Sequence, residues 1–252
     1  MKKYKIYPKD LEQYEQALDL CWPISYWLAP EEQTCRVVCN QKSQVHEVWL
    51  SELAFQSPDL LTPDIVHELC HCAIAEQVDP VFSTIWFSEK WNQISRMEPE
   101  RFGKLAQMLY LAWCHVDIWV NDLRHKHWPE LMAQEYSAFA QGVVILLQRQ
   151  ELEVLSRPET LLSLAQHQAE RERHGLTESP DLFAVLSAHG VEVEERIKGL
   201  ADFFKSLPRL CFKSRKDLKI LENSVVEVAR RLEFPINPKL IWEKDKWVWA
   251  LG

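Results

Sequence analysis

One short motif constrains this chain more than any other feature: His67 and His71 lie four residues apart, and Glu68 directly follows the first of them. The segment around the motif has the pattern of a helix. Its predicted start is Thr62-Pro63-Asp64, because threonine is a good N-cap, proline suits the first helical position and aspartate complements the helix dipole. We expect the helix to end near Gln77. The residues that flank the motif are apolar, as in a helix that packs into a core: Ile65, Val66, Leu69, Ala73, Ile74 and Ala75.

The spacing of the motif predicts a metal site. Residues four apart lie on the same face of a helix, so His67 and His71 can both direct a ring nitrogen at one ion. Zinc held by three protein ligands keeps a fourth position open for water, and it lowers the pKa of that water toward ~7. Glu68 would not be a ligand. It would take a proton as the water attacks a polarised carbonyl, and then deliver it to the leaving amine.

The motif resembles the active-site helix of the zincin metallopeptidases, which carries the same His-Glu-x-x-His pattern. The resemblance implies a zinc cofactor (Zn2+) and hydrolysis of a peptide bond in a protein or peptide substrate. It also implies that the edge of a preceding strand, Val45–Leu53, binds the main chain of the substrate. The residues after His71 lack the glycine and third histidine of the metzincins, so the third ligand should come from a later helix, as in the gluzincin and aspartate-liganded branches.

Four residues are candidates for that third ligand, and Asp117 is preferred over Glu135, Asp122 and His115. Asn121 follows Asp117 by one helical turn. In gluzincins the ligand carboxylate is followed, at this spacing, by a residue that hydrogen-bonds a ligand histidine. The stretch DIWVND that begins at Asp117 also resembles a family of predicted metallopeptidases associated with von Willebrand A domains. That family couples its His-Glu-x-x-His helix to a later Asp-x-x-Val-Asn helix, and the resemblance covers roughly residues 60–125.

Two segments before the motif predict strands. Cys35–Asn40 is apolar and β-branched, and the polar residues Asn40–Gln44 form a predicted hairpin loop to Val45–Leu53. The second strand alternates, so that one face carries His46, Val48 and Leu50.

The rest of the chain reads as mainly helical, which predicts an α+β fold that is mainly α. Helices are expected at residues 9–21, from Glu100 to about His125, and from near Pro129 to Gln150. An aromatic loop is expected between Pro23 and Pro30. The predicted organisation is a zincin-like domain over residues 1–155 and a helical C-terminal region of unknown role over 156–252. The tail LIWEKDKWVWALG is expected to be a short strand or an apolar plug.

The composition limits which binding partners and which cellular compartment are expected. The formal charge of -8 argues against nucleic-acid binding, which needs a basic surface. We find neither a signal peptide nor an apolar run of membrane-spanning length, and seven cysteines are an odd number, so a cytoplasmic protein with reduced thiols is expected. Cys35 and Cys39 are interpreted as strand residues rather than ligands. Cys70 and Cys72 are interpreted as small buried side chains, because residues two apart on a helix point in different directions.

The sequence leaves the substrate and the oligomeric state open. It also leaves a rival function open, that of a non-catalytic zincin-like protein that regulates or binds a partner. In a second rival interpretation the motif is accidental and no metal is bound.

Overall fold

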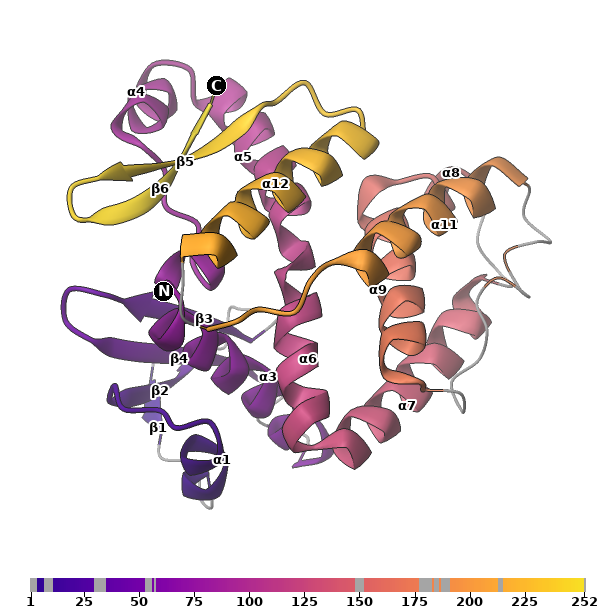
Figure 1. The fold of residues 1–252 in the computed structure, drawn as a ribbon, viewed down its shortest axis with the longest axis horizontal. Coiled ribbons are helices and arrows are strands. Elements are labelled where there is room, and N and C mark those ends of the chain that lie inside the picture. The colour runs from indigo at the N-terminus through magenta and orange to yellow at the C-terminus, as the bar shows by residue number, and fades with distance from the viewer. Residues whose placement is uncertain are drawn as a thin grey trace. The chain divides into compact units, whose positions relative to one another are not determined.

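The computed structural model describes residues 4–6, 11–29, 35–52, 56, 58–147, 152–176, 183, 186, 191–212 and 215–251. The fold is α+β and mainly α, as predicted (Figure 1). The chain forms two compact units. Unit 1 comprises Met1–Asn92, Leu210–Leu221 and Leu240–Ala250, and unit 2 comprises Gln93–Arg209, Glu222–Lys239 and Leu251–Gly252. This division differs from a boundary at residue 155, because C-terminal segments belong to both units.

Unit 1 contains a mixed four-stranded sheet in the order β1-β2-β4-β3. Its strands are β1 (Tyr4–Ile6), β2 (Ile24–Ala29), β3 (Arg36–Asn40) and β4 (Val45–Ser51). Strands β2 and β4 are parallel, and the other two pairs are antiparallel. The expected loop between Pro23 and Pro30 is therefore wrong: aromatic side chains favour a strand, and Pro23 lies just before it.

The predicted hairpin between β3 and β4 is confirmed. Asn40 Oδ1 accepts the backbone N–H groups of Lys42 and Ser43 at 3.0 and 3.1 Å, and Gln44 takes a positive φ of 51°. The predicted alternation is also confirmed, because His46, Val48 and Leu50 are all fully buried. The expectation that β4 offers a free edge is wrong, since β4 pairs with β2 on one side and β3 on the other. Strand β3 lies at the edge instead.

Helix α3 (Pro58–Gln77) carries the motif and packs against β3 and β4. It ends where predicted but begins before Thr62, so that Pro63 lies inside the helix. The apolar residues that flank the motif are buried as predicted, each at most 1% exposed.

The C-terminal residues form a hairpin of β5 (Pro238–Glu243) and β6 (Lys246–Leu251). Its turn residues Lys244 and Asp245 both take a positive φ, as the tight turns favoured in hairpins require. Trp249 is fully buried, and its backbone bonds to an adjacent part of unit 1. Its backbone N–H donates to the carbonyl of Trp86 at 2.8 Å, and its carbonyl accepts from the backbone N–H of Ser88 at 3.0 Å. The strand prediction for the tail is confirmed. The alternative, an apolar plug, does not describe Trp242, which is 54% exposed.

The remaining helices are α1 (Glu12–Ala17), α4 (Glu89–Met97), α5 (Pro99–Trp113), α6 (Asp117–His127), α7 (Pro129–Leu147), α8 (Leu152–Leu155), α9 (Pro158–His174), α11 (Val191–Ser206) and α12 (Arg215–Arg231). The helix predicted over 9–21 is therefore shorter. No helix in the described ranges is both long and apolar enough to cross a membrane.

The single helix predicted from Glu100 to His125 is two helices, α5 and α6, separated by a 3-10 turn at Cys114–Val116. The ring of His115 accounts for the local change. Its Nδ1 bonds to the carbonyl of Ala112 at 2.7 Å, and that carbonyl would otherwise serve the backbone of a continuous α-helix.

Candidate metal centre

His67 and His71 present their rings on one face of α3. The ring centroids are 5.0 Å apart and the ring planes make an angle of 73°. His71 is buried and His67 is partly exposed. The hydroxyl of Ser83 donates to the carbonyl of His71 at 2.7 Å and so holds the helix backbone at this point. The predicted pair of imidazoles is therefore assembled by one element of unit 1.

Glu68 lies beside His67 on α3 and is only 6% exposed. Its charge contributes to raising the pKa of the Cys35 thiol to about 11, after burial of that thiol and repulsion from Asp64. A carboxylate held in a partly desolvated place can accept and return a proton. This is the chemistry that the sequence assigned to it.

The first candidate group is the set chosen from the sequence: His67 and His71 belong to unit 1, and Asp117 begins α6 in unit 2. A second group, Cys39, His46 and Cys72, lies within unit 1 and offers ligand atoms within 4.8 Å of one another. This second group was not predicted from the sequence.

The other two carboxylate candidates, Asp122 and Glu135, form ion pairs with arginines of unit 2. Asp122 accepts two hydrogen bonds from Arg173, at 2.7 and 2.6 Å. Glu135 forms an ion pair with Arg124, a residue that is only 3% exposed. A guanidinium competes directly with a metal ion for a carboxylate, so these pairs count against Asp122 and Glu135 as ligands.

His115, the fourth candidate, is fully buried and uses both ring nitrogens. Nδ1 bonds to the carbonyl of Ala112 and Nε2 to the hydroxyl of Ser224, each at 2.7 Å. Burial lowers its pKa to about 4, so the ring is neutral at physiological pH. It is a core histidine.

The role predicted for Asn121, a hydrogen bond to a ligand histidine, is not what its amide does. Its Nδ2 donates to Glu170 Oε1 at 2.8 Å, and its Oδ1 accepts from Arg124 at 3.0 Å. The helical spacing from Asp117 is as predicted, but the side chain serves a buried polar network of unit 2. The analogy with gluzincins at this position is therefore wrong.

Glu170 lies at the centre of that network and is fully buried. Burial raises its pKa well above the usual range, and the charges of Asp117 and Asp122 act in the same direction. The hydrogen bond from Asn121 and the charge of Arg124 oppose the shift without cancelling it. Glu170 is therefore protonated in the folded protein at pH values where an exposed glutamate is charged.

We predict that Glu170→Gln becomes more stable relative to the wild type as pH rises above about 4.5, the ordinary pKa of glutamate. Above that pH the unfolded chain loses the Glu170 proton while the folded chain, in which the pKa is raised, still holds it, so wild-type stability falls by up to about 1.4 kcal/mol per pH unit. The glutamine variant has no such titration. Urea denaturation at several pH values measures the difference.

Glu172→Gln is the matched control, because Lys205 donates to Glu172 and lowers its pKa. The stability that this lowered pKa contributes is fully present above the unfolded pKa, so the difference between Glu172→Gln and the wild type should stay constant in the pH range where that of Glu170→Gln changes. A difference between Glu170→Gln and the wild type that does not change with pH would show that folded Glu170 is ionised, contrary to this prediction.

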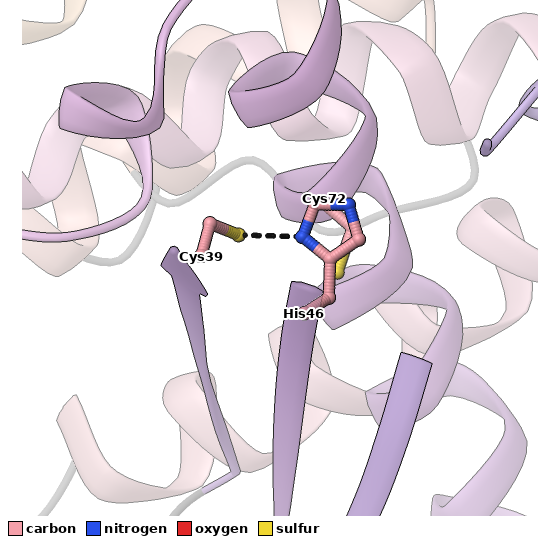
Figure 2. A group of neighbouring side chains, drawn as sticks. All are labelled: Cys39, His46 and Cys72. Carbon is pink, nitrogen blue, oxygen red and sulfur yellow. Dashed lines mark hydrogen bonds between the residues drawn. The ribbon is translucent and has the colours of Figure 1, made fainter. Parts of the chain in front are cut away.

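The second group joins three elements of unit 1 (Figure 2). Cys39 is on β3, His46 is on β4, and Cys72 is on α3; all three are fully buried. The interpretation of Cys39 and Cys72 as unrelated small residues is incomplete, although Cys70 does point elsewhere as expected and belongs to neither group. One sequence signal could have found part of it: a hairpin loop ending at Gln44 pairs Asn40 with Val45, and hence Cys39 with His46.

No known protein family, curated protein or solved structure matches this chain. The case for a function therefore depends on its own residues.

Proposed function

We propose that this chain is a zinc-dependent peptidase in which His67, His71 and Asp117 hold the ion and Glu68 is the general base. One observation carries the proposal: two imidazoles share one face of α3 with their centroids 5.0 Å apart, and the residue that follows the first of them is a buried glutamate. A purely structural site has no use for that carboxylate, which favours an enzyme over a non-catalytic zincin-like protein.

The donor set fits the proposed ion. Two imidazoles and one carboxylate are a common ligand set for catalytic zinc, which keeps a further position open. When bound, zinc would polarise the substrate carbonyl and lower the pKa of water. Glu68 would accept a proton from the attacking water and donate it to the nitrogen of the leaving amine. His67 and His71 would bind through ring nitrogens fixed by α3, whose backbone is bonded to Ser83.

The sheet offers a place for an extended substrate. Strand β3 pairs with no strand other than β4 within the described part of the sheet, although the backbone N–H of Cys39 donates to Thr84 Oγ1 at 3.4 Å. An edge strand can hydrogen-bond the main chain of a peptide without reading its side chains. We therefore assign substrate binding to β3 rather than to β4.

The proposal predicts metal-dependent cleavage of unstructured polypeptides. Zinc-loaded protein is incubated with a mixture of denatured proteins, and mass spectrometry identifies new N-termini. We expect new termini that disappear after chelation and return when zinc is restored. The control is His67→Ala, treated in the same way, which should yield none. If zinc-loaded wild type binds the ion at His67 and His71 and yet produces no more termini than the control, the enzyme proposal fails and the non-catalytic alternative is favoured.

A further inference from the structure

The group Cys39, His46 and Cys72 is independent of the proposed peptidase centre and has different chemistry. Cys39 and His46 are directly opposite in the β3–β4 ladder, and Cys39 Sγ lies 3.0 Å from His46 Nδ1. Cys72 faces them from α3, with its sulfur within 4.8 Å of both ligand atoms. Figure 2 shows the three side chains converging from two strands and a helix.

The far side of the His46 ring is fixed by a carboxylate. Nε2 lies 3.2 Å from Glu76 Oε2, and Glu76 accepts the backbone N–H groups of Cys21 and Trp22 at 2.8 and 3.0 Å. The ring of Trp22 also stacks on His46, with centroids 5.1 Å apart. A carboxylate on one ring nitrogen is the usual companion of a histidine whose other nitrogen binds a metal, because it sets the tautomer and the ring orientation.

We propose that Cys39, His46 and Cys72 form a second metal site that takes a thiophilic d10 ion, Zn2+ or Cu+. Two thiolates and one imidazole are soft donors, which favour these ions over magnesium, calcium or manganese. All three residues are fully buried, so the ion would be enclosed by protein. The carboxylate of Glu76 would not bind the ion itself and would instead hold the orientation of the His46 ring.

The present spacing is close to what the ion needs. Zinc–sulfur and zinc–nitrogen bonds of about 2.3 and 2.0 Å at a tetrahedral angle separate sulfur from nitrogen by roughly 3.5 Å. The observed separation of Cys39 Sγ and His46 Nδ1 is 3.0 Å. Binding therefore requires the two strand side chains to open by about half an ångström, a change within reach of small rotations about χ1.

The electrostatics of the group agree with metal binding. A hydrogen bond from Cys72 and then the neighbouring His46 lower the pKa of Cys39 to about 6, despite burial. The thiolate is the form that binds metals. The pKa of Cys72 is raised, first by burial and then by Cys39. Its proton would be released when a cation binds, as is usual for buried thiol ligands.

The site would fasten the β3–β4 hairpin to the helix that carries the peptidase motif. Cys72 directly follows His71, so the same turn of α3 would contribute to both centres. An ion that binds only the folded chain raises its free energy of unfolding, and this stabilisation increases with the logarithm of the affinity. We therefore expect this site to contribute to folding, whether or not the neighbouring centre is catalytic.

Cobalt substitution tests the second site in the intact protein. Co2+ bound by thiolates absorbs strongly in the near ultraviolet, whereas Co2+ bound only by imidazoles and a carboxylate does not. We expect this band in the wild type, and we expect it to persist in the double variant His67→Ala/His71→Ala. We expect it to be lost in Cys39→Ser/Cys72→Ser. Cys70→Ser, a buried cysteine on the same helix outside the group, is the control and should keep the band.

Two further measurements keep the test decisive if the double cysteine variant folds poorly. X-ray absorption of the zinc-loaded wild type should show sulfur among the zinc ligands, and anaerobic titration with Cu+ against a chromophoric chelator shows whether Cu+ is preferred. Three results would each overturn the proposal: metal-loaded wild type with no sulfur among the ligands, a Co2+ band that survives in Cys39→Ser/Cys72→Ser, or a Cys39–Cys72 disulfide that persists under reducing conditions. None of these results bears on His67 and His71, so the two proposals fail separately.

Discussion

Replacing Glu68 with glutamine is expected to lower kcat for peptide hydrolysis by about 10²- to 10⁴-fold while zinc remains bound, because this is the usual contribution of a positioned general base. Glutamine has nearly the same shape as glutamate but cannot accept a proton from water. Glu68 is 6% exposed, so the amide should occupy the same place beside His67. Initial rates on a cleaved peptide, with zinc content measured on the same samples, give both quantities.

Glu47→Gln on β4 is the control for the loss of one acidic group in unit 1 and should keep the wild-type kcat. The wild-type rate should also rise with pH through the apparent pKa of its base, and this limb should be absent in Glu68→Gln. If Glu68→Gln loses zinc together with activity, Glu68 is a ligand or a structural support. If it keeps both, another residue is the base.

The parts of the site that could be predicted are those encoded by local spacing. The pair His67 and His71 follows from the helical period alone, and the burial around it follows from the apolar residues that flank the motif. The β3–β4 hairpin was equally local, because its polar loop and its alternating strand lie within one short stretch. Asp117 was chosen by helical spacing from Asn121, yet the structure assigns Asn121 to Glu170 and Arg124. The partners of Asp122 and Glu135 count against those two residues, and Asp117 stays a prediction.

What could not be predicted depends on which elements meet. β4 is an interior strand because β2, separated from it by the whole of β3, pairs beside it in parallel. The group of Cys39, His46 and Cys72 requires the strand register and also the face that α3 presents to the sheet. No short motif encodes such a group, because its members come from three elements. The break at Cys114–Val116 occurs where His115 bonds to the carbonyl of Ala112, and that segment contains no proline or glycine.

Removal of His71 by substitution with alanine is expected to lower zinc affinity at the peptidase centre by more than 100-fold and to abolish turnover. Loss of a residue that only supports a ligand already lowers affinity by roughly 10- to 100-fold, and His71 is proposed as a ligand itself. His67→Ala should lower zinc affinity and turnover in the same way, although His67 is more exposed than His71. If both variants lose zinc, the loss in His71→Ala cannot be explained by a cavity left in the core at that position. Competition with a chromophoric chelator measures the affinity, and Cys70→Ala is the control on the same helix.

The third ligand is decided by the same assay applied to carboxylates. Asp117→Asn should lower zinc affinity about as strongly as the histidine variants, because an amide is a poor substitute for a carboxylate on zinc. Glu135→Gln should leave zinc bound, since its carboxylate pairs with Arg124. The reverse pattern would move the ligand from α6 to α7. Wild-type zinc content that resists every one of these substitutions, but falls in Cys39→Ser/Cys72→Ser, would leave the buried cysteine site as the metal centre and remove the basis for a peptidase.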